Sequence, residues 1–259
     1  MASRWKKKVG RPKTTWRRTV EKEKLGGWKN LRSGEEHNTD ITGRQALCPY
    51  VPGVEDAGGK CLPCIVDVRN ESQIQAAVDA AVNMFGGIDI LINNASAINT
   101  TGTLYTDIKR YDLMMNINTR GTFLTSKLCL PHLLKGRNPH ILNISPPLNM
   151  NPDWFKIHVA YTMAKYGMSM CVLGMAEEFR SDGIAVNALW PRTLIDTAAA
   201  TFVGGKHISD HTRKPEIMAD AAYLMLTKNS SRFTGNFCID DDILRDAGIT
   251  DLEQYAVKP

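Results

Sequence analysis

The chain has 259 residues, of which 43% are hydrophobic and 23% charged, a balance that is ordinary for a soluble globular protein of moderate size. Its apolar runs are too short to span a bilayer, and its basic N-terminus lacks the apolar core of a secretory signal peptide. Six cysteines spread over this length do not form a disulfide framework, so we expect a reducing compartment.

The net charge of +5 is concentrated at the N-terminus. The first thirty residues hold eleven Lys or Arg against two Glu, and the remainder holds 21 basic against 25 acidic residues. Residues 1–53 are polar, rich in Gly and Pro and without apolar periodicity, and we expect them to be disordered. Phosphate contacts by this basic tail, with Trp5, Trp16 and Trp28 as stacking groups, are a nucleic-acid-binding alternative to a solvated tail.

One part of this tail has a resemblance of its own. The segment Gly10–Lys22 resembles the C-terminal tail of retroelement reverse-transcriptase polyproteins. This resemblance suits a chimeric gene model or an exon-swapped transcript better than an evolved domain. We therefore set residues 1–53 apart from the domain that follows.

From residue 54 onward, strand and helix patterns alternate. Apolar runs typical of buried strands lie at 61–67, 88–92, 140–145, 184–190 and 236–240. Helical periodicity lies between them, at 71–85, 104–136 with a break near Asn116, 157–180 and 215–228. This alternation predicts one domain, residues 54–259, with an α/β fold in which helices cover both faces of a doubly wound, Rossmann-like parallel sheet.

Two spacings could indicate a metal site. Cys61 and Cys64 form a C-x-x-C pair, but no second pair follows, and residues i and i+3 of a strand point to opposite faces. His207 and His211 have the i, i+4 spacing of helical ligands, beside the loop glycines Gly204 and Gly205. We expect the cysteines to pack structurally, and we predict no metal site.

Polar residues follow the predicted strands at their carboxyl ends, where doubly wound sheets bind ligands. Asp67, Asn93–Ser96 and Ser145 close three strands, and Tyr161 lies on the next helix. Tyr161 and Lys165 share one helix face. A fixed cation beside a phenol lowers its pKa, and a shift from about 10 to about 7 needs about 4 kcal/mol. We therefore predict an acid/base centre for carbonyl and alcohol redox chemistry.

This ordered set resembles the short-chain dehydrogenase/reductase family over roughly residues 54–259. The matching motifs are Asp67-Val68, Asn93-Asn-Ala-Ser96, Asn118 within 116–121, Asn143-Ile-Ser145, Tyr161 with Lys165, and Val186–Pro191. Segments 142–148, 151–155 and 166–170 narrow the resemblance to one branch of the family.

The resemblance implies catalytic roles. Tyr161 would exchange a proton with the substrate oxygen, Lys165 would lower the pKa of the tyrosine and hold the nicotinamide ribose, and Asn118 would anchor a water. Ser145 is the candidate for orienting the carbonyl group. That role stays open, because the family usually has serine where this chain has Pro146, and because the gap to Tyr161 is wider than usual.

The resemblance also implies a cofactor site. Asp67 with Val68 would bind the adenine, Asn94 with Ala95 would pass close to the adenosine ribose, and Lys165 would bind the other end. The resemblance to this branch of the family favours NADP as the cofactor, with NAD as the alternative. The substrate it implies is a small molecule with a carbonyl or secondary alcohol group, lipid-like or steroid-like. By resemblance alone we expect a peroxisomal or mitochondrial location. The Met-rich helical segment from Tyr166 to Met175 is expected to be core or a helix-packed dimer face, and we expect a homo-oligomer that associates through the long helices.

One family element is missing from the sequence. The glycine-rich T-G-x-x-x-G-x-G turn, which follows the first strand and binds pyrophosphate at a helix N-terminus, does not occur. We therefore predict an N-terminally incomplete sheet with an unpaired edge and an exposed apolar face. An inactive chain that binds its cofactor poorly is the alternative to an active oxidoreductase.

Overall fold

A computed structural model describes residues 54, 58–197, 199–200 and 212–258. The chain divides into two units, 1–65 and 66–259, and every helix and strand named below belongs to the second. The predictions for the basic tail and for the pair His207 and His211 lie outside the described residues.

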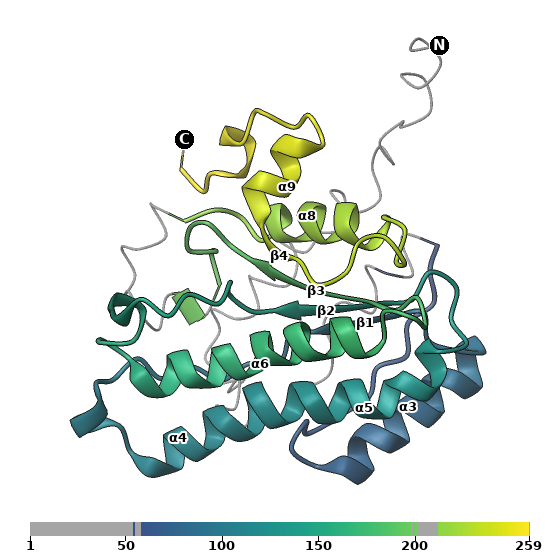
Figure 1. The fold of residues 1–259 in the computed structure, drawn as a ribbon, viewed down its shortest axis with the longest axis horizontal. Helices are drawn as coiled ribbons and strands as arrows, with labels where there is room; N and C mark the ends of the chain where they lie inside the picture. The colour runs from purple at the N-terminus through teal and green to yellow at the C-terminus, as the bar shows by residue number, and fades with distance from the viewer. Residues whose placement is uncertain (1–53, 55–57, 198, 201–211, 259) are drawn as a thin grey trace, which may run out of the picture. The chain divides into compact units, whose positions relative to one another are not determined.

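Four parallel strands form one sheet in the order β1–β2–β3–β4. Their bounds are β1 (Ile90–Asn93), β2 (His140–Ile144), β3 (Ala185–Trp190) and β4 (Phe237–Ile239). Asn93 pairs with Asn143, and Asn143 pairs with Ala188, so the carboxyl ends of the strands meet at one edge of the sheet (Figure 1). The predicted doubly wound parallel sheet is confirmed.

Helices cover the two faces of this sheet (Figure 1). On one face lie α3 (Glu71–Phe85), α4 (Ile108–Met114), η2 (Met115–Arg120), α5 (Gly121–Leu133) and α6 (Val159–Glu178). On the other lie α8 (Glu216–Leu226) and α9 (Asp240–Asp246), and short 3₁₀ turns span Thr103–Tyr105, Pro152–Trp154 and Glu253–Tyr255. The break predicted near Asn116 is the π-helical turn η2, a distortion that often accompanies functional sites.

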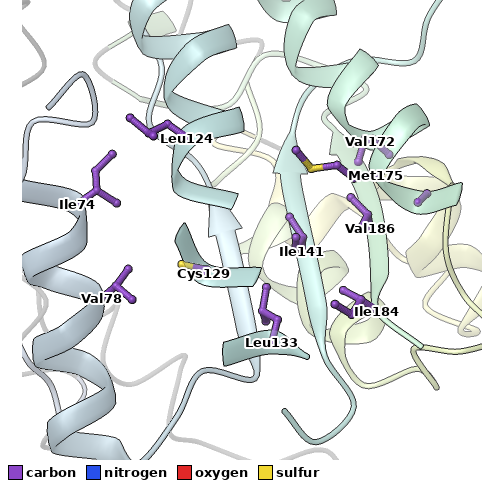
Figure 2. Packing of buried hydrophobic residues seen from close by; sticks show 12 residues of the cluster. Ile74, Val78, Leu124, Cys129, Leu133, Ile141, Val172, Met175, Ile184 and Val186 are labelled. Carbon is purple, nitrogen blue, oxygen red and sulfur yellow. The ribbon is translucent and has the colours of Figure 1, made fainter. Parts of the chain in front are cut away.

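Each face of the sheet has its own hydrophobic cluster. Ile141 of β2 packs on the α5 and α6 side, where Figure 2 shows it between Cys129 and Val186. Its neighbour Leu142 packs on the opposite side with Ile217 of α8. Successive strand residues alternate between faces, so β2 is buried on both sides, as the continuous apolar run at 140–145 predicted.

The edge strand β1 is buried on one side only. Leu91 packs with the cluster under α5, whereas Ile90 and Ile92 are 45% and 46% exposed. Because Ile92 is in register with Leu142, this exposed row lies on the α8 side of the sheet. Among the described strands, β1 pairs with β2 alone. The edge and the apolar face therefore agree with the prediction drawn from the missing glycine-rich unit.

The strand predicted at 61–67 is wrong. This segment pairs with no other described strand, Ile65 is 70% exposed, and Cys64 is exposed rather than packed. An apolar run becomes a strand only where neighbouring main-chain groups can pair with it. The glycine-rich turn that would follow such a neighbouring strand is missing from the sequence, which agrees with a segment that pairs with no strand in the described residues.

Helix α6 and the π-turn η2 approach each other closely at Gly167. Gly167 faces Thr119, and an added Cβ would lie 2.9 Å from the Thr119 Cβ and nearer still to its hydroxyl. The hydroxyl of Thr119 donates to the carbonyl oxygen of Ala164 at 3.0 Å, which fixes Thr119 in this position. The glycine therefore sets how closely α6 approaches η2.

Gly167→Ala is expected to lower the free energy of unfolding by about 1–3 kcal/mol, because the new methyl group overpacks a contact that cannot relax. Gly174→Ala, on the same helix, is the matched control, since no atom lies within 4 Å of its added Cβ. That control should be neutral or stabilising by up to about 1 kcal/mol. Urea unfolding of both variants measures the difference, and equal stabilities would contradict the close-contact assignment.

A second prediction concerns the edge of the sheet. Ile92→Lys places a charge on the exposed row of β1 and is expected to reduce self-association at high concentration without lowering stability by more than about 1 kcal/mol. Ile141→Lys, on the buried neighbouring strand, should instead abolish folding. Light scattering and thermal unfolding distinguish the two. Aggregation unchanged in Ile92→Lys would show that this edge is not the associating surface.

Candidate active site

Tyr161 and Lys165 lie in the first turns of α6, where the helix begins beside the carboxyl ends of β1, β2 and β3. Tyr161 is half-buried against Met114 and Ala164, and the ring of His158 contacts it edge-on at 5.9 Å. The hydroxyl of Tyr161 makes no hydrogen bond to another described residue. It is therefore left available to a ligand.

Lys165 is 4% exposed, and neutral groups surround its amine. The Nζ atom donates to the carbonyl oxygen of Ile144 at 2.8 Å and to the hydroxyl of Ser96 at 3.3 Å. Met168 Sδ lies 3.5 Å away, and the ring of Trp190 lies 5.3 Å from Nζ. Within the described part of the chain, no carboxylate lies within ion-pair distance of this amine.

Burial shifts the two pKa values in opposite directions. It lowers the pKa of Lys165 to about 7 and raises the pKa of Tyr161 to about 12. Removal from water disfavours the charged form of each group, which is the ammonium of one and the phenolate of the other. In the cofactor-free chain the pKa of Tyr161 is therefore shifted upward by desolvation, opposite to the expected fall toward neutrality. The role of Lys165 in lowering that pKa stays a prediction.

Asn118 positions the loop after β1. Its side chain exchanges two hydrogen bonds with the backbone of Ala97: Nδ2 donates to the Ala97 carbonyl at 2.9 Å, and the Ala97 N–H donates to Oδ1 at 2.7 Å. Asn118 is fully buried in the π-turn η2. The contact holds the loop that carries Ser96, the hydroxyl partner of Lys165, and the proposed water-anchoring role stays a prediction.

A buried chain of amides links β1, β2 and α6. Asn93 Nδ2 donates to Asn143 Oδ1 at 2.8 Å and to the hydroxyl of Ser126 at 3.0 Å. Asn143 Nδ2 donates onward to the carbonyl oxygen of Met168 at 3.1 Å. The sequence motifs identified both asparagines, but they gave no sign that the two side chains contact each other.

Ser145 lies at the carboxyl end of β2, as predicted, but it is fully buried. Its hydroxyl has no hydrogen-bond partner, and its backbone N–H donates to the Asn143 carbonyl at 3.0 Å. The carbonyl of the next residue, Pro146, accepts from Ser169 at 2.6 Å. Ser145 therefore has an unused donor near the site without an open surface, and its role in orienting a carbonyl group stays a prediction.

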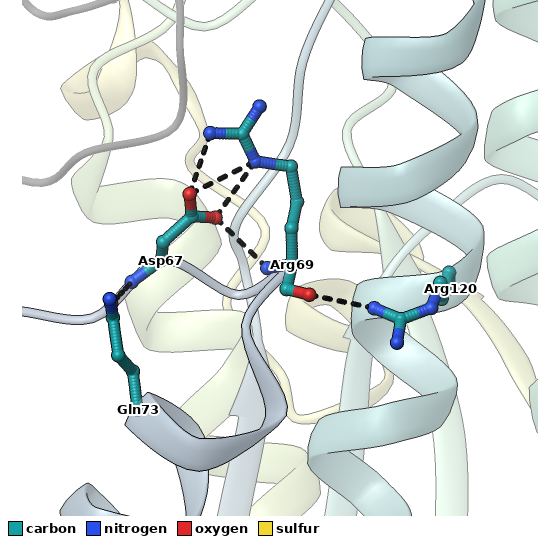
Figure 3. A network of polar contacts seen from close by, with 4 residues as sticks. All are labelled: Asp67, Arg69, Gln73 and Arg120. Atoms are coloured by element: carbon teal, nitrogen blue, oxygen red, sulfur yellow. Dashed lines mark hydrogen bonds and ion pairs between the residues drawn. The ribbon is translucent and has the colours of Figure 1, made fainter.

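The adenine-side candidate Asp67 already has a strong partner. Figure 3 shows its carboxylate facing Arg69, with Nε to Oδ1 at 2.9 Å and Nη2 to Oδ2 at 2.6 Å. The carbonyl of Arg69 accepts in turn from Arg120 Nη1 at 2.8 Å. An adenine amine that bound this carboxylate would compete with a bidentate ion pair, which is the stronger type of charged contact.

The remaining cofactor candidates lie on two loops. Val68 packs on α5, where an added Cβ at Gly121 would come within 3.2 Å of it. Asn94 is exposed, and Ala95 is half-buried, in the loop after β1. Asn94 and Ala95 follow the carboxyl end of β1, and the cofactor-binding roles of all three residues stay predictions.

Sequence reasoning missed an ionic cluster beyond β3 and β4. The backbone N–H of Arg192 donates to Asp240 at 2.9 Å, and its guanidinium donates to Asp241 at 3.0 Å and to Asp242 at 2.7 Å. The other oxygen of Asp241 lies 3.6 Å from Arg213. Three consecutive aspartates after the last predicted strand were the available signal. The cluster fixes the turn that follows β3.

Two further findings concern metal-ligating side chains and long apolar helices. In residues 58–197 and 212–258, no group of three His, Cys, Asp or Glu side chains could hold a metal ion. No helix in the same described ranges is both long and apolar enough to cross a membrane.

The sequence profile described as short chain dehydrogenase matches residues 47–204, which is more than half of the chain. The chain belongs to the short-chain dehydrogenase family. Its members are oxidoreductases that use a nicotinamide dinucleotide, NAD(H) or NADP(H).

This short-chain dehydrogenase is 67% identical over 219 residues to hydroxysteroid dehydrogenase-like protein 2 of Danio rerio. It is 63% identical over 206 residues to the Homo sapiens protein of the same name. The alignments cover 82% and 80% of this chain but 52% and 49% of those relatives, so the chain spans about half the length of the curated relatives it matches. The branch indicated by segments 142–148, 151–155 and 166–170 is confirmed.

Solved structures support the same assignment. A Xanthomonas campestris protein described as a dehydrogenase is 50% identical, with a TM-score of 0.79 over 83% of this chain and 82% of that one. A short chain dehydrogenase from Mycobacterium thermoresistibile is 48% identical, with a TM-score of 0.76 over 81% and 74%. A 7α-hydroxysteroid dehydrogenase bound to NADH and 7-oxo glycochenodeoxycholic acid, at 24% identity and a TM-score of 0.63 over 73% and 76%, shows the fold alone.

The buried amine of this short-chain dehydrogenase gives a stability prediction. The pKa of Lys165 is about 7 in the fold, against about 10.4 in an unfolded chain, so unfolding takes up a proton between these values. Stability should therefore rise with pH from about 7 to about 10, and below pH 7 the folded state bears the whole cost of a buried ammonium.

Lys165→Met removes this cost and is expected to raise the free energy of unfolding at pH 7 by roughly 1–3 kcal/mol, after the lost hydrogen bond and ring contact are discounted. The gain should shrink toward pH 10. Denaturant unfolding at pH 6, 7, 8.5 and 10 measures it. A stability difference that does not change with pH would contradict a depressed lysine pKa.

Proposed function

We propose that this chain transfers hydride between NADP(H) and a carbonyl or secondary alcohol, with Tyr161 as the proton donor or acceptor. One observation carries the proposal: an available tyrosine hydroxyl lies one helical turn from a buried amine, at the carboxyl edge of the sheet. Acid/base groups at this edge are positioned to act on a ligand that binds beyond the strands.

The nicotinamide end of the cofactor fits the residues around Lys165. The amine donates to Ser96, an exposed hydroxyl, and to a main-chain carbonyl, so its donors point toward the edge of the sheet and are not consumed by a carboxylate. Such a donor suits ribose hydroxyls. The dinucleotide supplies the hydride when it is bound. Lys165 would hold it at this end, and the loop fixed by Asn118 would border it.

Tyr161 is suited to donate a proton in the direction of carbonyl reduction. With its pKa near 12, the phenol is protonated at neutral pH and can hydrogen-bond a substrate carbonyl oxygen. As the oxygen gains negative charge, the proton moves to it from the phenol. A protonated Lys165 would stabilise the phenolate that remains. In the oxidation direction the same groups act in reverse, and activity should then need higher pH.

Apolar side chains near this edge favour a lipid-like or steroid-like substrate. Leu104 and Tyr105 are 84% and 79% exposed, and Trp154 and Ile157 are 58% and 62% exposed. The carbonyl of Trp154 accepts from Thr162 on α6 at 2.8 Å, and Gly102 lies beside the carbonyl of Ile157. These side chains therefore lie on two neighbouring segments beside the first turns of the catalytic helix α6. An apolar substrate bound there would cover them.

A cofactor-poor, inactive chain is the second candidate function. It is favoured by the missing glycine-rich turn, by the exposed row Ile90 and Ile92 on β1, and by the ion pair that occupies Asp67. In this reading the proton-transfer residues are present, but the pyrophosphate lacks the backbone donors of the glycine-rich turn, and the carboxylate that would accept from the adenine is already bound to Arg69. The two candidates differ in one measurable quantity, the affinity for the dinucleotide.

Three finer points complete the proposal. NADP is preferred to NAD because of the branch resemblance, and peroxisomal or mitochondrial location rests on that resemblance alone. Homo-oligomerisation through the long helices is supported by exposed apolar side chains on α5 and α6, namely Phe123, Met170 and Leu173. Each is 52–58% exposed, which is unusual for large apolar residues along two adjacent helices.

Cofactor titration and one substitution test the proposed function. NADPH fluorescence should show saturable binding to the chain, and Tyr161→Phe should keep the dissociation constant while lowering kcat by roughly 10²–10⁴-fold. Tyr223→Phe, at an exposed tyrosine of α8, is the control and should change neither quantity. Binding weaker than millimolar in the unchanged chain would leave the cofactor-poor reading as the conclusion.

A further inference from the structure

The amine of Lys165 must carry a charge to stabilise a phenolate, yet its surroundings work against that charge. Its described hydrogen-bond acceptors are a carbonyl, a hydroxyl and a thioether, and none is anionic. A carbonyl or a hydroxyl also accepts from a neutral amine, so these contacts select weakly for the ammonium. Buried ammonium groups in proteins are ordinarily paired with a negative group.

Trp190 is the neighbour that distinguishes a charged amine from a neutral one. Its ring centroid lies 5.3 Å from Nζ, within the range of about 6 Å in which the negative face of an indole attracts a cation. Indole is the strongest of the aromatic side chains in this interaction, and its strength increases when the cation is removed from water. Lys165 is nearly inaccessible, so the contact is of the stronger, desolvated kind.

The backbone fixes the ring in this place. Trp190 is the last residue of β3 and is held in register with Ile239 of β4. Beyond it, the backbone N–H and the guanidinium of Arg192 are bound by the aspartates that follow β4. The ring is half-buried on a rigid strand end, and not on a free loop. Its position relative to α6 is therefore set by the sheet.

We propose that Trp190 is a positioning residue for the catalytic amine. Its ring face attracts the Lys165 ammonium and takes the place of the carboxylate that an ordinary buried ion pair would have. The inference rests on the proposed function, because it concerns the same acid/base pair. It assigns a role to a residue that lies within the Val186–Pro191 motif but had none. A neutral π-face favours the charge without becoming a base that could compete for the proton of Tyr161.

Other titratable groups at this edge do not take over that role. Tyr161, with His158 against its ring, lies on the same helix and is itself protonated at neutral pH. Arg192 carries the same sign of charge as Lys165, and Asp241 and Asp242 both bind Arg192. On η2, Arg120 donates to the backbone carbonyl of Arg69.

The test is the titration of Lys165 in the full, cofactor-free chain. Lysine labelled with ¹³C at Cε gives an NMR signal whose shift follows protonation, and Lys165→Met assigns the signal by its loss. Trp190→Leu should lower the pKa of Lys165 by about one unit, or about tenfold in the protonation equilibrium. Trp190→Phe, which keeps a ring face, should shift it less. Trp154→Leu, at an exposed tryptophan, should leave it unchanged.

A second measurement is needed in case Trp190→Leu fails to fold or lets water reach Lys165. Replacing tryptophan with 5-fluorotryptophan weakens the ring face and leaves its size almost unchanged, so the pKa of Lys165 should fall in a normally folded chain. An unchanged or raised pKa in the fluorinated chain would overturn the proposal. Because neither experiment uses NADPH, failure of cofactor binding would overturn the proposed function and leave the result on Trp190 intact.

Discussion

A chain of buried amide hydrogen bonds holds the candidate site together. Asn93 at the end of β1 donates to Asn143 of β2, and Asn143 donates to the carbonyl of Met168 in α6. Amides without partners in a core are costly, at about 1–3 kcal/mol each, so these contacts select one register of the strands and one depth for the helix. The place of Lys165, one turn before Met168, follows from that depth. The position of the acid/base pair is therefore fixed by these amide contacts between the sheet and α6, in addition to the hydrogen bonds that Lys165 itself makes.

The same packing creates a conflict between stability and chemistry. It removes both the amine and the phenol from water, which favours neutral lysine and neutral tyrosine. The neutral phenol suits proton donation, but the neutral amine does not suit the stabilisation of a phenolate. A contact that keeps the Lys165 amine charged in this site is thus as important for the proposed proton transfer as Tyr161 itself. A hydrophobic residue in place of Lys165 would satisfy the fold better, which is a common property of functional groups.

Periodicity and motif order predicted most of the fold, because the strands β1 to β4 and the helices between them follow local patterns. The prediction failed at 61–67, where the local pattern was correct for a strand but no strand among the described residues pairs with it. The motifs also placed Tyr161, Lys165, Asn118 and Ser145 near one edge. They could not give the sign of the pKa shifts, since burial is a property of the packed chain. The motif that contains Trp190 and the run of three aspartates were visible in the sequence, but the contacts of Trp190 with Lys165 and of Asp241 with Arg192 were not, because each joins residues far apart along the chain.

The carboxylate of Asp241 has a consequence for the connectivity of the chain. One oxygen binds Arg192 and the other faces Arg213, while the backbone N–H groups of Asp196 and Arg213 donate across to the carbonyls of Arg213 and Leu194. The two ends of the intervening segment are thus joined by non-covalent contacts as well as by the chain. A single cut between them would leave both pieces attached, each carrying part of the sheet or its covering helices.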